Sequence, residues 1–414
     1  MHPKEISIKD FTYELPIEKI AQYPLPERDS SKLLIYSNGN IQSDKYSNLD
    51  HYLPENSFLV FNNSKVIEAR IFFQLPAGGS IEIFCLGPDD KYLDISTALS
   101  QKGKVEWKCL VGGAKKWKQG LLSKQIINGA VLSVEKKEKH DDYFLIEFIW
   151  NDEALCFADI LHYSGQVPLP PYLNRNTEES DKESYQTVYA KHDGSVAAPT
   201  AGLHFTENLF RKLDAKKIDH AFVTLHVSAG TFKPVKSETL ETHEMHAEFF
   251  SVDRPLIRKL MEPDKAIVSV GTTSLRVIES LYWMGVKINK LLRQSGSVTI
   301  QDISIRQWDP YNLNDNIIPA KDALQALLNW MKGEKIEQLV TQTQIIIAPG
   351  YTFQIINGLI TNFHQPGSTL LLLVAALVGD DWKKIYNYAL ENDFRFLSYG
   401  DGGLLWKQEH TESK

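Results

Sequence analysis

The stretch AIVSVGTTSLRVIESLYWM, residues 266–284, decides the fold. Its first five residues, 266–270, are small or β-branched and are typical of a short buried strand. Glycine and hydroxyl-bearing residues at 271–274 indicate a turn, and the apolar residues of 275–284 indicate a helix. A strand that passes through a short turn into a helix is the building unit of an α/β fold.

The same alternation recurs along the chain on both sides of this stretch. Strands are predicted at 58–61, 221–227 and 345–348, and helices at 206–217, 369–377 and 382–392. Thr206 and Ser368 stand where N-cap residues are expected. We therefore predict the α/β class, as a layered α/β sandwich with a mixed sheet covered by helices.

The sequence between about 70 and 155 has a different texture. Its β-prone runs SIEIFCL, VEWKCLV, AVLSV and DYFLIEFIW are separated by turns rich in Gly, Asp and Lys. Regularly spaced short strands without helical periodicity predict a small β-barrel domain. The α/β catalytic domain is then discontinuous, formed by 1–69 and 156–414. Within it, 286–340 is polar and irregular until an amphipathic helix at 319–332.

The charge of the chain is unevenly distributed. The 414 residues carry a formal net charge of −7, which by itself argues against a polyanionic partner. Residues 101–140, however, contain ten Lys and three Glu, a local charge of +7, so the remainder carries −14. This window is either a solvated lysine-rich loop or a local contact with nucleic acid, made by Lys115, Lys116 and Lys118 around Trp117.

Cysteine usage and hydropathy place the chain among cytoplasmic proteins. The three cysteines are widely spaced and form no CxxC pair, so they suggest neither a disulfide framework nor a zinc site. A reducing cytoplasm fits this pattern. The longest apolar run, 370–378, has nine residues, far short of the roughly 20 that a membrane span needs, so no membrane partner is expected.

The first candidate site is the GTTSLR turn. Backbone N–H groups and the hydroxyls of Thr272, Thr273 and Ser274 converge there, after Gly271, at the start of a helix. Such a helix start binds a carboxylate or a phosphate, and Arg276 could add a contact. The alternative is an ordinary capped helix.

The second candidate is GSVAAPTAGLHFT, residues 194–206. Its small residues allow a ligand to approach the backbone closely. Thr200 and His204 supply a hydroxyl and an imidazole, and imidazole is the side chain best matched to proton transfer near pH 7. The alternative is a tight structural loop with a surface histidine.

The third candidate is a group of histidines. His226 lies on a predicted strand, and His243, His246 and Glu248 follow in HEMHAE. Their spacing is not that of a zinc-binding helix, in which two histidines stand four residues apart. An acid–base role for one of them, histidines at a sheet edge, and a metal site therefore remain alternatives.

Two further segments carry polar groups near the C-terminus. Asn362 and His364 end a strand-like run, where ligands bind in open α/β sheets. Arg395, Tyr399 and Asp401 lie among glycines and aromatics, where they could stack on a base and hydrogen-bond to its edge. Packed turns are the alternative for both segments.

Twelve segments together identify a family that none of them identifies alone. They are DFTYELPIEKIAQYPLPERDSSKLL, LVFNNSKVIEAR, GGSIEIF, PLPPYL, YQTVYA, GSVAAPTAGLHFT, TLHVSAGTF, HEMHAE, VGTTSLR, APGYTF, LITNFHQPGSTL and FRFLSYGD. In this order they closely resemble the S-adenosylmethionine:tRNA ribosyltransferase-isomerase family of queuosine biosynthesis. The resemblance covers nearly the whole chain except about 286–340.

The resemblance implies a cytoplasmic enzyme that uses S-adenosylmethionine as co-substrate and no metal. Its partner is a tRNA that carries 7-aminomethyl-7-deazaguanine at the wobble position. Enzymes of this family transfer the ribosyl group of S-adenosylmethionine to the aminomethyl nitrogen and isomerise it. The products are epoxyqueuosine-tRNA, adenine and methionine. The family fold, an α/β sandwich with a small inserted β-barrel, agrees with the change of texture at about 70. We expect a monomer.

This chemistry suggests roles for the candidate residues. The sulfonium centre acidifies the ribose C5′–H bonds, so a base must remove a proton there; His204 is the first choice and His226 the second. The departing adenine needs hydrogen bonds or a proton, which Tyr399, Asp401 or His364 could supply.

Binding roles are assigned to the other candidates. The methionine carboxylate fits the GTTSLR helix start, with Arg276. The 7-deazaguanine edge fits Asn362 or Asp401, and Thr200 and Arg395 complete the predicted substrate contacts.

The chain also departs from the family pattern. Ser228 and Ala348 replace the usual Gly and Tyr, Gln365-Pro366-Gly367 replaces Leu-Pro and a charged residue, Gly402-Gly403 replaces Ala-Met, and 286–340 is an insertion. Two alternatives therefore stay open. One is a tRNA-binding paralogue without this activity, and the other is a metal-dependent hydrolase that uses His243, His246 and Glu248.

Overall fold

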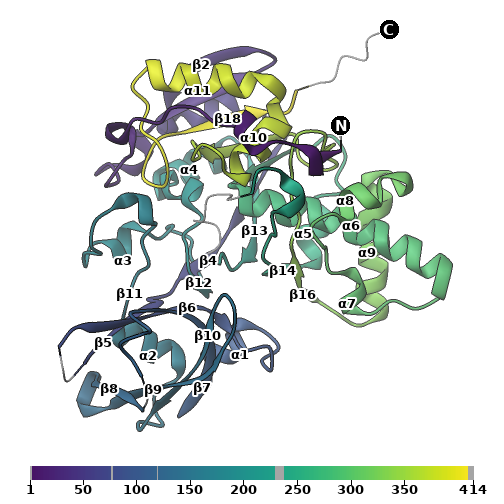
Figure 1. Cartoon of the computed structure of the whole chain (residues 1–414). Coiled ribbons are helices and arrows are strands. Elements are labelled where there is room, and N and C mark those ends of the chain that lie inside the picture. Colours follow the sequence, from purple (N-terminus) through teal and green to yellow (C-terminus); the bar gives the residue numbers. More distant parts are fainter. Residues whose placement is uncertain (1, 76–77, 119, 229–236, 409–414) are drawn as a thin grey trace.

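The body of the molecule is a mixed nine-stranded sheet. The computed structural model describes residues 2–75, 78–118, 120–228 and 237–408, and in them the strand order is β16-β14-β13-β3-β15-β17-β18-β1-β2 (Figure 1). The four pairs β13/β3, β3/β15, β15/β17 and β1/β18 are parallel, and the remaining pairs are antiparallel. The bounds are β1 Lys32–Ser37, β2 Asn40–Lys45, β3 Ser57–Asn62, β13 Asp219–Leu225, β14 Glu248–Asp253, β15 Ala266–Val270, β16 Gln338–Thr343, β17 Gly358–Asn362 and β18 Gly402–Trp406.

Helices cover both faces of this sheet. On β3, Phe58 and Val60 face one hydrophobic core, while Leu59 and Phe61 face the other, because successive side chains of a strand point to opposite sides. The first core receives α5, α6, α9, α10 and α11, and the second receives α4. The predicted layered α/β sandwich is therefore confirmed. The helix bounds are α4 Glu207–Ala215, α5 Arg254–Lys259, α6 Thr272–Ser295, α9 Ala320–Gly333, α10 Thr369–Val378 and α11 Trp382–Glu391.

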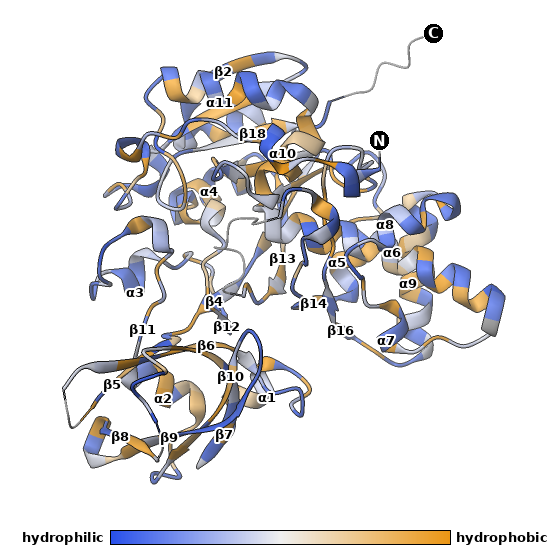
Figure 2. Cartoon of the chain, viewed as in Figure 1, coloured by the Kyte–Doolittle hydropathy of each residue, from blue (hydrophilic) through white to orange (hydrophobic). Residues whose placement is uncertain are grey.

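A separate antiparallel sheet curls around its own core below this body (Figure 1). Its order is β11-β5-β6-β7-β10-β9-β8, and Figure 2 shows hydrophobic residues along β6 and the enclosed α2. In the described residues its end strands β11 and β8 do not pair, so it is a half-barrel, a more open form of the predicted barrel. The boundaries predicted for this domain, 70–155, stay a prediction. The bounds are β5 Arg70–Gln74, β6 Ser80–Pro88, α1 Ile95–Leu99, β7 Lys104–Gly112, β8 Leu122–Gln125, β9 Val131–Lys139, β10 Phe144–Trp150, α2 Phe157–Ser164 and β11 Gly165–Gln166.

Short elements connect and flank the two sheets. The strands β4 and β12 form a two-stranded parallel ladder at the junction. The helices α7 and α8 precede α9, which packs on α6 through a close approach of Gly285 to the backbone of Ala323. The bounds are β4 Ser64–Val66, α3 Asp181–Ser184, β12 His192–Ser195, α7 Ile300–Ile303 and α8 Asp309–Asn312.

Two local predictions were wrong. Residues 345–348 were predicted to form a strand, but β16 ends at Thr343, where its pairing with Glu248 of β14 ends, and the chain continues without a partner strand. The GTTS turn is shorter than predicted: Gly271 alone makes it, with a φ of +88° that favours glycine, and α6 begins at Thr272. In the described part of the chain no helix is long and apolar enough to cross a membrane.

Candidate functional site

A cavity with an empty volume of about 740 Å³ lies beyond the carboxyl ends of β15 and β17. Parallel strands of an open α/β sheet bind their ligands at this edge. Four segments singled out in the sequence meet in its wall, which is formed by residues at 197–201, 271–273, 361–368 and 397–398 with Tyr172, Val227 and Leu370. Segments up to 200 positions apart thus form one site.

The amino end of α6 forms part of this wall. Its N-cap, Gly271, offers no side chain to the free backbone N–H groups of the first turn, so these groups remain available to a ligand. Thr272 and Thr273 line the cavity, and the hydroxyl of Thr273 is buried and has no hydrogen-bond partner among the described residues. Ser274 instead donates its hydroxyl hydrogen to the carbonyl of Val270 at 3.0 Å. An anionic group placed here would satisfy both the helix end and Thr273.

Asn362 connects the cavity to the histidine predicted as the base. Its Oδ1 accepts a hydrogen bond from Thr200 Oγ1 at 2.8 Å, and its Nδ2 lies 3.3 Å from Nε2 of His204. His204 is itself 3% exposed, stacks on Tyr46, and does not line the cavity. It therefore lies one layer behind the wall. Burial lowers the pKa of His204 to about 4, so its ring is neutral at pH 7.

His364 is the histidine that lines the cavity. Its Nε2 lies 2.9 Å from the hydroxyl of Thr361, and its backbone is fixed by the hydroxyls of Tyr386 and Tyr13. Burial lowers the pKa of His364 to about 3. The imidazole is therefore neutral at physiological pH: one ring nitrogen can accept a proton, and the other carries a hydrogen that it can share in a hydrogen bond.

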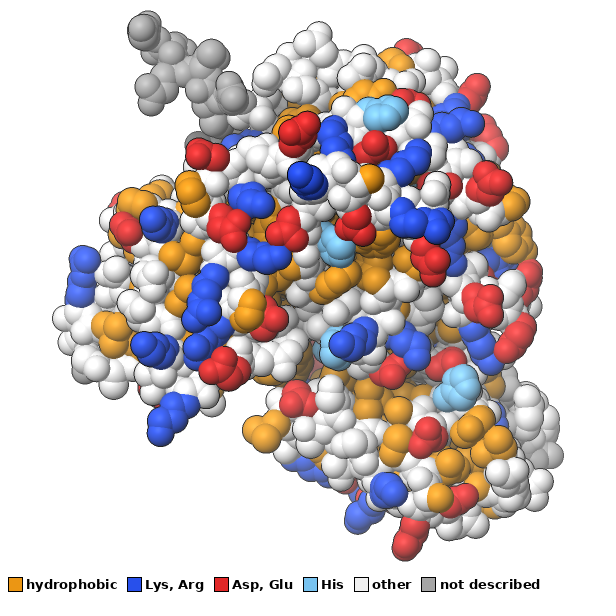
Figure 3. All heavy atoms as spheres, turned by 180° about the vertical axis from the view of Figure 1, so that it is seen from behind, with side chains coloured by type: hydrophobic (Ala, Val, Ile, Leu, Met, Phe, Trp, Pro, Cys, Tyr) orange, Lys and Arg blue, Asp and Glu red, His pale blue; other side chains and the backbone are white. Residues whose placement is uncertain are grey.

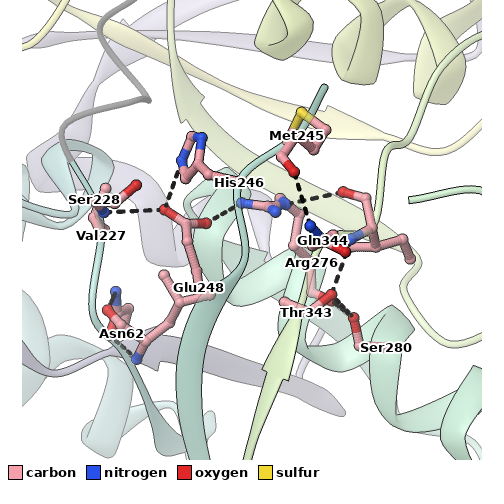
Figure 4. Close-up of polar contacts among 12 residues, drawn as sticks. Asn62, Val227, Ser228, Met245, His246, Glu248, Arg276, Ser280, Thr343 and Gln344 are labelled. Atoms are coloured by element: carbon pink, nitrogen blue, oxygen red, sulfur yellow. Dashed lines mark hydrogen bonds and ion pairs between the residues drawn. The ribbon is translucent and has the colours of Figure 1, made fainter. Parts of the chain in front are cut away.

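A buried ion pair supports the wall from behind. Arg276 contacts the carboxylate of Glu248 through Nη1, and its Nε donates to the carbonyl of Ile345 at 3.2 Å (Figure 4). Glu248 also accepts a hydrogen bond from the backbone N–H of Ser228 at 3.1 Å. Burial favours the neutral form of Glu248, but the charge of Arg276 and the nearby imidazole of His246 lower its pKa to about 2.

The histidine group predicted as a possible metal site has a different arrangement. His246 Nε2 lies 3.6 Å from Glu248, whose other carboxylate oxygen is taken by Arg276. A cation at this carboxylate would stand next to a buried guanidinium and be repelled by it. Among the described residues, no group of three or more His, Cys, Asp or Glu side chains could hold a metal ion. His226, the second candidate base, lies against Gly194 instead of the cavity.

The candidates Arg395, Tyr399 and Asp401 serve the scaffold, whereas Leu397 and Ser398 of the same segment line the cavity. Asp401 accepts hydrogen bonds from the backbone N–H groups of Lys32 and Arg395, at 2.9 and 2.8 Å, and is 2% exposed. Tyr399 donates to Asp181 at 3.1 Å. Neither Asp401, Tyr399 nor Arg395 lines the cavity, so the structure does not bring them to the other candidates.

The basic patch lies on the half-barrel. Lys115, Lys116 and Lys118 are exposed, whereas Trp117 between them is 2% exposed and packs into the core of that unit. The aromatic ring is thus a structural anchor and is not available for base stacking. On the face shown in Figure 3, positive and negative side chains are interspersed over the α/β body.

Several wall residues were not singled out from the sequence. Tyr172 and Ser398 line the cavity and share a 2.5 Å hydrogen bond, and Thr361, Gln365 and Ser368 complete the polar wall. Tyr172 belongs to PLPPYL, a segment in which no ligand contact was predicted from the sequence. The signal that was available is its place among the twelve ordered segments.

Two comparisons relate the chain to known proteins. The model of a family described as "Queuosine biosynthesis protein" matches residues 8–405. Among solved structures, the chain is similar to the crystal structure of S-adenosylmethionine tRNA ribosyltransferase from Thermotoga maritima. The two sequences are 27% identical, the match covers 96% of this chain and 99% of that chain, and the TM-score is 0.45.

Proposed function

The chain belongs to the queuosine biosynthesis protein family, and from this premise we propose that it is an S-adenosylmethionine:tRNA ribosyltransferase-isomerase. It transfers the ribosyl moiety of S-adenosylmethionine to the aminomethyl nitrogen of 7-aminomethyl-7-deazaguanine in tRNA and isomerises it. Epoxyqueuosine-tRNA forms, and adenine and methionine are released.

The convergence of four sequence segments in one cavity carries this proposal. The cavity wall combines a helix end that favours an anion with neutral hydrogen-bonding groups. The carboxylate of the co-substrate fits the start of α6, at Gly271–Ser274. The amide of Asn362 and the hydroxyls of Thr200 and Thr361 suit the edge of a base.

We propose His364 as the group that removes the C5′ proton. It is the histidine in the wall, and its ring is neutral at pH 7, the protonation state that a base requires. A pKa of about 3 makes it a weak base, so the neighbouring sulfonium must supply the acidity of the C5′ proton. His204 then acts through Asn362 as a positioning residue, because its Nε2 faces that amide. This exchanges the roles that the sequence suggested for the two histidines.

The departing adenine needs a donor that is protonated at neutral pH. Neither His204 nor His364 is an imidazolium at neutral pH, since burial lowers the pKa of both, so neither is a general acid. Tyr172 lines the cavity, and burial raises its pKa to about 12, so its hydroxyl keeps its proton. We assign to Tyr172, with Ser398, the hydrogen bond that stabilises the leaving base.

The tRNA is proposed to approach from the half-barrel. The window 101–140 carries +7 on a chain of net −7, and Lys115, Lys116 and Lys118 are exposed on it. Phosphate contacts from such lysines position an RNA without reading its sequence. We further propose that the enzyme acts in the cytoplasm and as a monomer. We also propose that it needs no metal, because the reaction requires only proton transfers and the departure of adenine and methionine.

The test is adenine release from S-adenosylmethionine by the purified protein with precursor tRNA. The wild type should release adenine and convert the tRNA, as followed by mass spectrometry. His364→Gln should lower the rate by about 10²–10⁴-fold, the usual contribution of a proton-transfer group. The matched control is His162→Gln, which changes an exposed histidine on α2. Wild-type protein that releases no adenine would refute the proposal.

A further inference from the structure

A second cavity, with an empty volume of about 460 Å³, adjoins the first. Thr272, Thr273 and Leu370 line both cavities, so the amino end of α6 lies between them. Most of the second wall is apolar and includes Met245, Ile346 and Leu373. Arg276 is the one charged side chain among the described residues that line it.

The hydrogen bonds of Arg276 are incomplete. The side chain is 7% exposed, and Figure 4 shows its guanidinium with Glu248 on one side and the chain that follows Gln344 on the other. Nη1 and Nε have partners, but Nη2 is buried with none among the described residues. The hydroxyl of Thr273, three positions earlier on α6, is likewise buried and has no hydrogen-bond partner among the described residues. Buried donors without acceptors are costly, and both of these groups line the second cavity, where a ligand oxygen would supply the acceptor.

We propose that the second cavity receives the methionyl end of the co-substrate, with its carboxylate on Nη2 of Arg276 and on the Thr273 hydroxyl. The inference rests on the proposed function. A cation, a helix amino end and a hydroxyl all favour an anion at one place. The apolar side chains of Met245 and Leu373 suit the two methylene groups that join the sulfonium to the carbon bearing this carboxylate.

Glu248 is a positioning residue in this arrangement. It holds Nη1 of Arg276 and leaves Nη2 for the ligand. It also compensates the buried cation when the cavity is empty, because a guanidinium without a counter-charge is costly in a protein interior. Replacing Glu248 by glutamine should therefore raise KM for S-adenosylmethionine more than it lowers kcat.

The experiment compares S-adenosylmethionine with its decarboxylated analogue in the presence of precursor tRNA. Calorimetry gives both affinities, and adenine release gives KM and kcat. The wild type should bind S-adenosylmethionine about ten- to a hundredfold more tightly, the range for a hydrogen-bonded charged contact. In the variants this preference should shrink to within about threefold, because only the carboxylate-bearing ligand loses a contact.

Two variants keep the test independent of folding. Arg276→Gln is combined with Glu248→Gln, so that no charge is left buried alone. Thr273→Val removes the hydroxyl without touching the ion pair. The matched control is Ser280→Ala, one turn further along α6, whose hydroxyl bonds to Arg276 O and Thr343 and lines neither cavity.

The outcomes separate the two proposals. Wild-type protein that binds S-adenosylmethionine and releases adenine, but binds the decarboxylated analogue equally well, overturns the carboxylate site and leaves the proposed function standing. The same holds if both variants keep the full preference of the wild type. Wild-type protein that neither binds S-adenosylmethionine nor releases adenine overturns both.

Discussion

Replacing Glu248 by glutamine should destabilise the protein strongly, because Arg276 would then be a buried cation without a counter-charge. Glu248 is 1% exposed, and its pKa is lowered from 4.5 to about 2. At about 1.36 kcal/mol per pKa unit, this difference corresponds to about 3 kcal/mol of stability at neutral pH. Breaking a buried pair by removing one partner typically costs about 3–5 kcal/mol, in agreement with that figure.

Urea unfolding at pH 7, followed by tryptophan fluorescence, measures the loss. The control is Glu337→Gln, which removes a largely exposed partner of Arg254 at 2.8 Å and should cost about 0–1 kcal/mol. The double variant Glu248→Gln with Arg276→Gln should be less destabilised than the sum of its single variants, since the two side chains interact.

The pH dependence has a definite sign. A carboxyl whose pKa is lowered by folding stabilises the protein above its unfolded pKa, and this stabilisation is lost as the pH falls through the folded value. The difference between wild type and Glu248→Gln should therefore be full above pH 4.5 and shrink toward pH 2. If Glu248→Gln costs no more than Glu337→Gln at pH 7, the ion pair does not support the site as argued.

Two further predictions concern catalysis and RNA binding. The pKa of His364 is lowered to about 3, so kcat/KM for adenine release should show no acidic limb near the ordinary histidine pKa of about 6.5 when measured from pH 5 to 8. Replacing Lys115, Lys116 and Lys118 by glutamine should lower the slope of log affinity for tRNA against log salt by about two to three, as measured by filter binding from 50 to about 200 mM salt.

One outcome would contradict the predicted pH profile, and another would contradict the predicted salt dependence. A limb near pH 6.5 that disappears in His364→Gln would show that the cavity histidine titrates normally. An unchanged salt slope in the lysine variant would show that the three lysines do not contact tRNA and form only a solvated loop. Replacing three exposed lysines on the α/β body, Lys321, Lys332 and Lys335, provides the control of equal charge.

The fold was predictable where local pattern and tertiary context agree. Hydrophobic runs of four or five residues followed by a glycine turn and an amphipathic stretch identify β15 and α6 from sequence alone. The run IIIA at 345–348 has the same composition but forms no strand. A strand needs a neighbour with free backbone groups, and β14 provides none beyond Glu248. No local pattern can report where a partner ends.

The candidate site was predictable as a set of segments but not as a set of side chains. The sequence identified the four segments that form most of the cavity wall, because glycine, proline and hydroxyl residues at strand ends mark the ligand-binding edge of an α/β sheet. It could not tell which of two histidines faces the cavity. His204 and His364 lie 160 positions apart, and Asn362 stands between the first of them and the ligand space.

Asp401 is a residue that the sequence predicted as a ligand contact but that the fold uses for its own hydrogen bonds. A carboxylate among glycines and aromatics has the composition of a base-binding group, yet both of its oxygens accept backbone N–H groups, from Lys32 and Arg395. These bonds join the start of β1 to the loop before β18, and such pairing is visible only once the chain is folded. The polar residues proposed to bind the carboxylate, Thr273 and Arg276, are instead ones whose hydrogen bonds remain incomplete among the described residues. Incomplete hydrogen bonding is a property of the folded environment, so a site can be located from sequence while its contacts cannot.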